Sequence, residues 1–328
     1  MGYCMMMTDD AYSDTFTMAA VQHSSVYWDL DASTDLACKL ISNAAQMGAN
    51  IVCFGESWLP GYPFFIQGLP GPEAQEHALN YLANAVEVPG PHTAAIGAAA
   101  AEHGVDVVIG AAERSRSSGS VYCSILFFDN QGNLLGRHRK LKPTYLERLV
   151  WADGDLAGLI AYQRPYGRIS GLNCWEHQMM LPGYSLAMQG TQIHVAAWPG
   201  WEPEAASARV DLAPAFWPRM SLLSRAFASQ AACYVVAVGG LWRSQDVPDA
   251  LRSYIKIPRT GDSMIISPSG HVLAGPLHDE SGILVAQGSL REVAKAKLQL
   301  DIAGHYGRPD LFRDPVLPPE DDRRGRGG

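Results

Sequence analysis

The stretch GRISGLNCWEHQMMLPGYSLAMQG, residues 167–190, joins a strand pattern to a helical pattern through a cysteine. The apolar run 169–172 ends at Asn173, and Cys174 comes next. A side chain in a sharp strand-to-helix turn projects away from the backbone, and the following amides face whatever that side chain attacks. The positive end of the following helix also favours a thiolate. The pattern therefore predicts a nucleophilic Cys174, with the backbone N–H of Trp175 as part of an oxyanion hole.

Simpler roles remain open for this stretch. Most lone cysteines are small buried hydrophobes, and Cys174 could be one of them. Glu176 and His177 follow closely, but residues of a first helical turn often only cap the helix. Cys174 and His177 are too few to hold a metal ion, and no other Cys/His cluster completes a site. We therefore predict no metal.

Composition indicates a globular protein. The chain has 328 residues, of which 47% are hydrophobic and 18% charged, so material for a large core is available. The net charge of −8 argues against a nucleic-acid partner. No apolar run is long enough for a membrane span, and the amino terminus lacks the pattern of a secretion signal. Six scattered cysteines indicate reduced thiols, and we predict a cytoplasmic location.

Strand and helix patterns alternate along the chain. Two segments, 121–140 and 264–277, read as hairpins, which points to two mixed β-sheets with helices outside rather than a parallel barrel. The segment 57–75 is rich in Pro, Gly and aromatic residues and is predicted to be a long functional loop. Other strands are expected at 18–22, 50–57, 105–113, 167–173, 191–199, 234–240 and 282–290, and helices at 36–47, 92–102, 178–190, 217–231 and 290–300.

Charged residues at two other strand ends are further candidates. Glu56 follows the apolar run IVCFG, where burial would raise its pKa and suit it to proton transfer; the alternative is a surface glutamate that opens the loop. Lys140 and Lys142 lie at the end of another predicted strand. Both could be solvated, or one of them could turn inward and balance the charge of Glu56. Glu147 could then position that lysine or a water molecule.

Three segments together resemble one family. FGESWLPGYP (54–63), HRKLKPTYLER (138–148) and LNCWEH (172–177) occur in the order typical of the nitrilase branch of the carbon–nitrogen hydrolase (nitrilase) superfamily. The likeness covers about residues 17–313, so we expect an extension at 1–16, a carbon–nitrogen hydrolase domain at 17–313 and a disordered tail at 314–328.

The resemblance implies a fold and a site. The fold is a four-layer α-β-β-α sandwich, assembled as a homodimer across a helical interface or as a larger homo-oligomer, in many relatives a spiral. The catalytic triad is Glu56, Lys140 (not Lys142) and Cys174, and the family's second glutamate is Glu147. No cofactor is implied.

The resemblance also implies an activity. The CWEH tail is similar to that of nitrilases, including arylacetonitrilases and cyanide-converting enzymes, so the expected reaction converts an aryl or arylalkyl nitrile to its acid and ammonia through a Cys-thioimidate and a thioester. Amidases and carbamoylases share the triad, and a catalytically silent assembly protein is a further alternative. Six side chains, most of them aromatic, are expected to bind the substrate: Trp58, Tyr62, Phe64, Trp175, His177 and Trp198. Core packing is the alternative for each aromatic residue, above all for Trp198.

Overall fold

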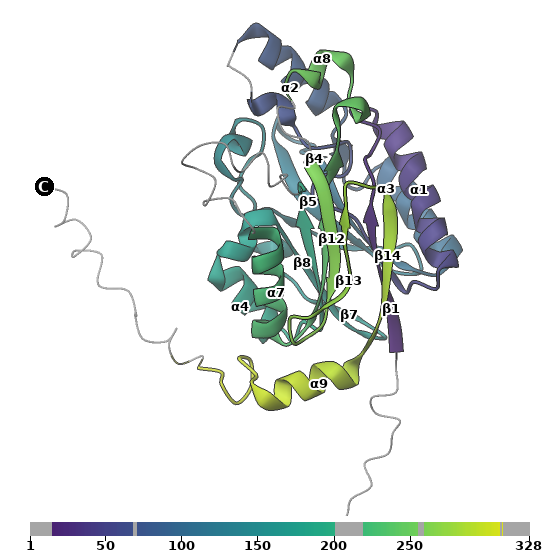
Figure 1. The fold of residues 1–328 in the computed structure, drawn as a ribbon. Helices are drawn as coiled ribbons and strands as arrows, with labels where there is room; N and C mark the ends of the chain where they lie inside the picture. Colours follow the sequence, from purple (N-terminus) through teal and green to yellow (C-terminus); the bar gives the residue numbers. More distant parts are fainter. Residues whose placement is uncertain (1–14, 68–70, 201–218, 255–258, 309, 311–328) are drawn as a thin grey trace, which may run out of the picture.

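The computed structural model describes residues 15–67, 71–200, 219–254, 259–308 and 310. The expected tail at 314–328 and nearly all of the expected extension at 1–16 lie outside these residues. Within them, strands form two mixed sheets that pack face to face, with helices on both outer faces (Figure 1). The predicted four-layer α-β-β-α sandwich is confirmed.

The first sheet has the strand order β14-β1-β2-β4-β5-β6, with β3 paired to β4. Strands β1, β2 and β4 run parallel, and β5 and β6 follow as the predicted antiparallel hairpin. The bounds are β1 Thr15–Gln22, β2 Ile51–Cys53, β3 Val86–Glu87, β4 Asp106–Arg114, β5 Val121–Phe128, β6 Leu134–Arg139 and β14 Gly282–Ser289.

The second sheet has the order β11-β12-β10-β9-β8-β7, with β13 paired to β12. Strands β8, β9 and β10 are parallel, and the second predicted hairpin forms the antiparallel pair β12–β13. The bounds are β7 Tyr162–Arg164, β8 Gly167–Asn173, β9 Ile193–Trp198, β10 Tyr234–Gly239, β11 Leu241–Trp242, β12 Arg259–Ile266 and β13 Val272–His278.

Alternation along the strands builds the layers. On β4, Val108 faces the core between the two sheets, while its neighbours Val107 and Ile109 pack against the helices outside the first sheet. On β10, Val236 faces the other sheet and Val235 faces the helices outside the second sheet. A strand places successive side chains on opposite faces, so strands covered on both faces read as continuous apolar runs.

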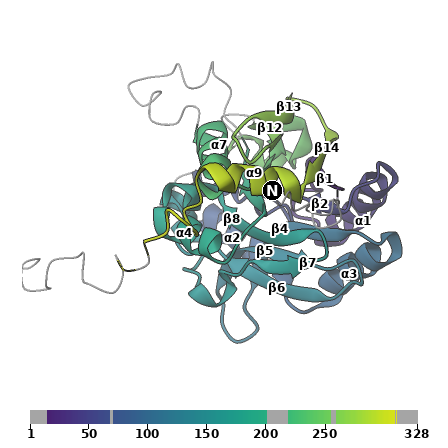
Figure 2. The same cartoon turned by 90° about the horizontal axis from the view of Figure 1, so that it is seen from below.

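The helices cover the two outer faces. Helices α1 (Leu30–Gln46) and α3 (Pro91–His103) pack on the first sheet, and α4 (Met180–Met188) and α7 (Arg219–Ala231) on the second. The two pairs lie on opposite sides of the sheets in Figure 1, and α9 (Leu290–Gln299) crosses one end of both sheets in Figures 1 and 2. No helix among the described residues is long and apolar enough to cross a bilayer.

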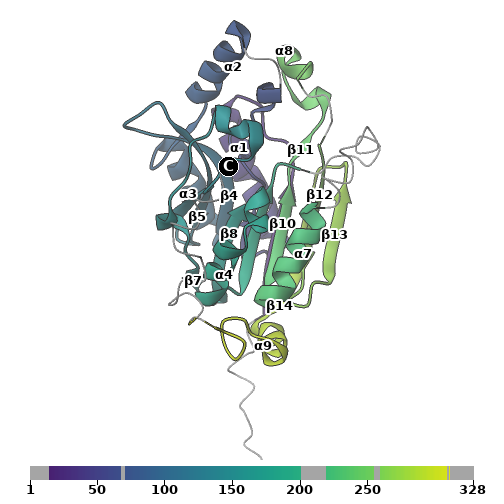
Figure 3. The same ribbon diagram turned by 90° about the vertical axis from the view of Figure 1, so that its left-hand side faces the viewer.

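Two expectations need correction. The segment 57–75 is not all loop, because it contains a 3-10 helix at Phe64–Gln67 and the start of α2 (Pro72–Ala83). Helix α2 lies beside the short α8 (Asp249–Arg252) at the end of the molecule opposite α9 (Figure 3). The helix expected at 178–190 is shorter: it is α4, Met180–Met188. A 3-10 turn at Cys174–Gln178 precedes it.

Candidate active site

The carboxyl ends of three strands converge. Glu56 lies just after β2, Lys140 directly follows β6, and Cys174 directly follows β8. A backbone hydrogen bond of 3.3 Å from the N–H of Glu56 to the carbonyl of Trp198, at the end of β9, joins the two sheets at this edge. The site is therefore built from both sheets, at the ends of strands whose interiors are rigidly packed.

Glu56, Lys140 and Glu147 form a buried chain of charges. Their side chains are at most 4% exposed, and the Nζ of Lys140 lies 2.6 Å from Oε1 of Glu56 and 2.7 Å from Oε2 of Glu147. The hydroxyl of Tyr62 donates to the other oxygen of Glu147 at 2.9 Å, and the backbone N–H of Thr144 donates to Oε2 at 2.6 Å. The ammonium group lies between two carboxylates, and the further donors bind the carboxylate oxygens of Glu147. These contacts offset the free-energy cost of burying the charges.

Burial changes the acidity of these groups. Desolvation, opposed by Lys140 and reinforced by Glu147, raises the pKa of Glu56 to about 7. Burial alone would lower the pKa of Lys140, but the carboxylates of Glu147 and Glu56 raise it well above its usual value. Glu56 can therefore exchange a proton near neutral pH while Lys140 stays charged, as a general base and an electrostatic stabiliser require.

Cys174 occupies a strained turn. Its backbone φ is +48°, a left-handed conformation that costs a non-glycine residue about 1–2 kcal/mol. The residue is 4% exposed, and burial, together with the charge of Glu56, raises the pKa of the thiol well above its usual value. Lys140 and the backbone N–H of Trp175 act in the opposite direction and lower that pKa. Cys174 is thus a thiol at rest that needs a base, and Glu56 is electrostatically coupled to it.

Glu176 joins the strand ends that carry Lys140 and Cys174. Its buried carboxylate accepts hydrogen bonds from the backbone N–H of Leu141 at 2.9 Å and of Asn173 at 2.8 Å. The Nε2 of His138 lies 3.0 Å from both of its oxygens, so that nitrogen carries the proton. Burial alone would raise the pKa of Glu176, but these donors lower it below its usual value. Glu176 caps the turn, as one of the two sequence interpretations held.

The partly buried His177 begins a hydrogen-bond chain that leads into the core, to His194 and Ser170. Its Nδ1 lies 2.7 Å from the carbonyl oxygen of Cys174 and must donate, so its Nε2 accepts from the Nε2 of His194 at 3.0 Å. The Nδ1 of His194 in turn accepts from the hydroxyl of Ser170 at 2.8 Å. Burial lowers the pKa of His177 to about 4 and that of His194 well below its usual value, so both rings are neutral. His177 thus holds the backbone of the turn, which differs from the substrate-binding role expected for it.

A glycine allows the Glu56 loop to approach the first sheet. A Cβ added to Gly110, on β4, would lie 2.1 Å from the carbonyl oxygen of Gly55 and 2.6 Å from the backbone nitrogen of Ser57. The neighbouring Leu59 bonds back to β4 through its N–H, at 3.1 Å from the Gly110 carbonyl. Only a residue without a side chain fits at this position, and the loop that carries Glu56 lies against it.

The expected aromatic side chains divide into two groups. Tyr62 contacts Glu147, and Phe64 packs on the Tyr62 ring at 5.0 Å, so both lie at the charge chain. Trp58 instead packs on Phe54 in the core outside the first sheet and donates to the carbonyl of His23, which differs from the expected pocket role.

The two remaining tryptophans lie on the side of the second sheet. Trp198 is 3% exposed and packs under α7, where its indole donates to the hydroxyl of Ser224 at 3.2 Å, so core packing describes it. Trp175 is half-buried beside Cys174, with the guanidinium of Arg219 4.5 Å from its ring centroid. Of the two lysines, Lys142 is exposed and pairs with Asp153, so only Lys140 turns inward.

Sequence reasoning missed three neighbours of this site. Cys123 on β5 places its Sγ 3.5 Å from Oε1 of Glu56, and the ring of Trp151 lies 5.6 Å from the Nζ of Lys140. His138 supports Glu176 as described above. Strand alternation could have found His138, because residues two apart lie on the same face of a strand. His138 and Lys140 are two residues apart near the end of β6, and both are buried.

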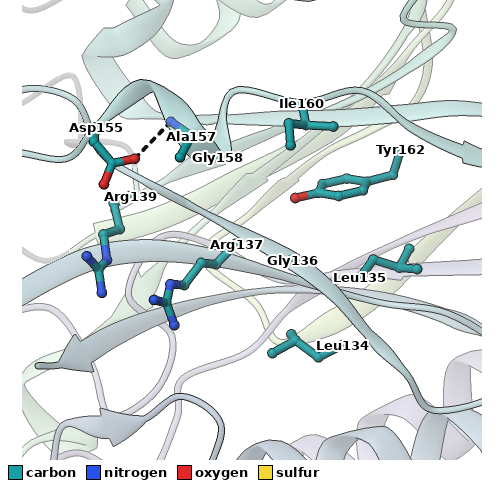
Figure 4. Close-up of a pocket in the computed structure, with 10 residues that line it drawn as sticks. All are labelled: Leu134, Leu135, Gly136, Arg137, Arg139, Asp155, Ala157, Gly158, Ile160 and Tyr162. Atoms are coloured by element: carbon teal, nitrogen blue, oxygen red, sulfur yellow. Dashed lines mark hydrogen bonds between the residues drawn. The ribbon is translucent and has the colours of Figure 1, made fainter. Parts of the chain in front are cut away.

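A cavity of about 330 Å³ lies elsewhere, along the edge strand β6 (Figure 4). Its wall on the other side is the segment from Asp155 to Tyr162, and the residues of the charge chain do not line it. Arg137 and Arg139 in its lining both pair with Glu113. In the described part of the chain, no three His, Cys, Asp or Glu side chains group as metal ligands.

Comparison with known proteins identifies the family of the chain. The profile of the carbon–nitrogen hydrolase family matches residues 17–298. Nitrilase 2 from an unknown prokaryotic organism is 47% identical over 299 residues, which cover 90% of this chain and 91% of the relative. The bifunctional nitrilase/nitrile hydratase NIT4B of Nicotiana tabacum is 34% identical over 321 residues, which cover 93% of this chain and 87% of the relative.

A solved structure shares the fold. The carbon–nitrogen hydrolase from Helicobacter pylori G27 superposes with a TM-score of 0.72 at 18% identity, over 93% of this chain and 99% of that chain. At 18% identity the likeness concerns the fold alone. The two curated relatives are 47% and 34% identical to this chain along almost its whole length. The chain therefore belongs to the carbon–nitrogen hydrolase (nitrilase) superfamily, and to its nitrilase branch.

Proposed function

We propose that this protein hydrolyses an aryl or arylalkyl nitrile to the carboxylic acid and ammonia, with Cys174 as nucleophile. The observation that carries the proposal is the buried chain in which Lys140 bridges Glu56 and Glu147 within electrostatic reach of the Cys174 thiol. The chain supplies a base that titrates near pH 7 and a permanent cation, and the turn supplies a sulfur. These are the groups that nucleophilic attack on a carbon–nitrogen bond needs.

The first step forms a thioimidate. Glu56 takes the proton of the Cys174 thiol, the sulfur adds to the nitrile carbon, and the proton passes to the nitrile nitrogen. One carbon–nitrogen π bond is lost and one carbon–sulfur bond forms. Lys140 and the Trp175 N–H stabilise the negative charge that develops on nitrogen.

Water completes the reaction in two further steps. Glu56 takes a proton from the first water, which adds to the thioimidate carbon, and passes that proton to the nitrogen. The new hydroxyl then gives its proton to the nitrogen through Glu56, and the carbon–nitrogen bond breaks to leave a thioester and ammonia. A second water attacks the thioester and releases the acid and the Cys174 thiol. If the first tetrahedral species expels Cys174 instead of ammonia, an amide leaves. The tobacco relative is named a bifunctional nitrilase/nitrile hydratase, which supports both acid and amide as products of the present chain.

The aromatic side chains around the charge chain support an aryl or arylalkyl substrate. Tyr62 packs against Phe64 with ring centroids 5.0 Å apart and against Trp151 at 5.6 Å. The Tyr62 hydroxyl is tied to Glu147, so this aromatic wall is fixed relative to the acid–base groups. In this proposal the flat apolar group of the substrate lies beside this aromatic cluster.

Product analysis tests the proposal. Purified protein is incubated with phenylacetonitrile and, separately, with phenylacetamide, and ammonia, acid and amide are quantified. We expect ammonia and phenylacetic acid from the nitrile, and no turnover by Cys174→Ala with unchanged circular dichroism. Turnover of the amide alone would assign the protein to amide hydrolysis. An inactive wild type across a broad nitrile and amide panel would support the silent alternative.

We also propose a homodimer or larger homo-oligomer in a reducing compartment, the cytoplasm. Exposed apolar side chains on adjacent α4 and α7 support self-association: Met180 is 86%, Leu181 65% and Leu222 57% exposed. The cysteines that the structure describes are free, which supports the location. Light scattering of the wild type and of Leu181→Glu tests the assembly; a wild-type monomer would contradict it.

A further inference from the structure

A second buried thiol touches the proposed base, and the reaction scheme does not use it. Cys123 lies in β5, is 1% exposed, and places its Sγ 3.5 Å from Oε1 of Glu56. An ionised carboxylate can only accept, so the thiol donates. Burial, and then the charge of Glu56, raises the pKa of Cys123 well above its usual value. Cys123 therefore keeps its proton at neutral pH and acts as a donor.

The two oxygens of Glu56 are used unequally. Oε1 accepts from the Nζ of Lys140 at 2.6 Å and from Cys123. Oε2 is buried and has no hydrogen-bond partner among the residues that the structure describes. A buried oxygen without a partner costs free energy, and such oxygens in native structures often have a catalytic role. Here Oε2 is the oxygen with free lone pairs for a proton from sulfur or water.

Cys123 contacts both ends of the ion pair. Its thiol bonds Glu56, and its backbone carbonyl accepts a hydrogen bond of 2.7 Å from the backbone N–H of Lys140. One residue of a central strand thus sets the separation between the base and the cation. The rigidity of β5, paired on both sides by β4 and β6, is passed on to the pair.

From these contacts we infer that Cys123 is a positioning residue for the general base. Its S–H, together with Lys140, holds Oε1 of Glu56, so that Oε2 is the oxygen that exchanges the proton. The inference rests on the proposed function in one respect, the role of Glu56 as a base toward Cys174.

A donor at the carboxylate also favours its charged form, so Cys123 lowers the pKa of Glu56. The other titratable groups that act on Glu56, or on which it acts, come from the loop after β2, α2, the end of β6, the 3-10 turn that follows it and the turn after β8: Tyr62, Tyr81, Lys140, Glu147 and Cys174. None of these changes in a Cys123 variant, so a shift in titration reports the lost thiol.

The test is the pH dependence of Cys174 alkylation. Iodoacetamide is applied to the folded protein from pH 5 to 9, and the modified Cys174 peptide is quantified by mass spectrometry. Cys123→Ala and Cys123→Val remove the donor with different volumes, and Cys123→Ser retains one. Cys233→Ala is the matched control, because Cys233 is equally buried but precedes β10, at the opposite end of the strands from the site.

We expect the alkylation rate to rise with pH as Glu56 loses its proton. The midpoint should move up by about half a pH unit in the Ala and Val variants, because a thiol is a weak donor to a charged acceptor. It should move back toward the wild-type value in Cys123→Ser and stay unchanged in Cys233→Ala. An unmoved midpoint in the Ala and Val variants, or equal shifts in all three Cys123 variants, would overturn the inference.

Nitrile turnover, measured on the same samples, separates the two claims. If the midpoint moves as expected while wild type converts no nitrile, the inference about Cys123 holds and the proposed function fails. If wild type converts nitrile and the midpoint does not move, the proposed function holds and Cys123 is only a core residue.

Discussion

The carboxylate of Glu176 accepts a hydrogen bond of 2.9 Å from the backbone N–H of Leu141. Leu141 follows Lys140, and Glu176 lies two residues after Cys174. The contact therefore connects the strand end that supplies the cation to the turn that supplies the sulfur. This explains why a glutamate stands two residues behind the thiol in the sequence: it orders the backbone of the site.

Replacing Glu176 by Gln should disorder both strand ends. An amide has one acceptor oxygen, so its NH₂ group would face a backbone N–H or His138, leaving a buried donor unpaired. We expect a loss of about 3 kcal/mol in the free energy of unfolding in urea, and a fall of about 10²-fold in kcat/KM. Glu292→Gln, at an exposed pair with Lys295, is the control and should cost about 0.5 kcal/mol at most. A Glu176→Gln protein as stable and active as that control would contradict this role.

The two lysines of the KLK sequence provide a matched pair. Lys140→Met should lower kcat/KM by about 10²- to 10³-fold, because the charge that stabilises the developing anion is gone. Lys142→Met should stay within about twofold, since an exposed ion pair contributes little. Steady-state kinetics with phenylacetonitrile measures both. Equal losses, or a larger loss at Lys142, would show that the wrong lysine has been assigned.

Stability should fall in mild acid because of His177. Its pKa is lowered from 6.5 to about 4, so the unfolded chain binds a proton before the folded protein does. The contribution of the neutral ring, about 3 kcal/mol at most, is complete above pH 6.5 and is lost as the pH falls toward 4. Urea unfolding at pH 7 and pH 5 should show a smaller difference in His177→Gln, by up to about 2 kcal/mol, than in wild type. His305→Gln, an exposed control, should retain the wild-type difference; a His177→Gln protein that also retained it would refute the assignment.

Gly110→Ala should displace the loop that carries Glu56. The added Cβ would clash with backbone atoms of Gly55 and Ser57, which cannot rotate away. We expect a loss of about 1–3 kcal/mol in stability and a reduced kcat. Gly119→Ala, where a Cβ meets nothing within 4 Å, should leave both unchanged. Normal activity in Gly110→Ala would mean that the loop position does not control the base.

The longer strands and most helices were predictable from local pattern, whereas the short strands β3, β7 and β11 were not predicted. The apolar runs of β4, β8 and β10 are continuous because both of their faces are covered, and NQGN in the β5–β6 hairpin is a direct turn signal. Helix α2 was missed because only Tyr81 among its residues is buried, so it lacks an apolar stripe. The turn at Cys174 was recognised from its place between a strand and a helix, although its first part is a 3-10 turn.

The residue pattern alone indicated the site only where a charged residue follows an apolar run. Glu56 became a candidate because it follows an apolar run, where a charge needs a partner. Lys140 could be chosen over Lys142 only from the resemblance to the nitrilase family. The contribution of Cys123 could not, because a cysteine in an apolar strand looks like any core residue until its neighbours are known. The placement of Trp58 and Trp198 in the core, away from the charge chain, likewise depends on which face of each strand or loop is turned outward.

Covalent trapping on Cys174 tests the central claim most directly. Protein turning over phenylacetonitrile is quenched in acid, and its intact mass and peptides are measured. The account predicts an adduct on Cys174 that carries the mass of the nitrile or of its acyl group, absent from Cys174→Ala and strongly reduced in Glu56→Gln, which lacks the base that deprotonates the thiol. Nitrile turnover that continues in Cys174→Ala, or an adduct on another residue, would contradict it.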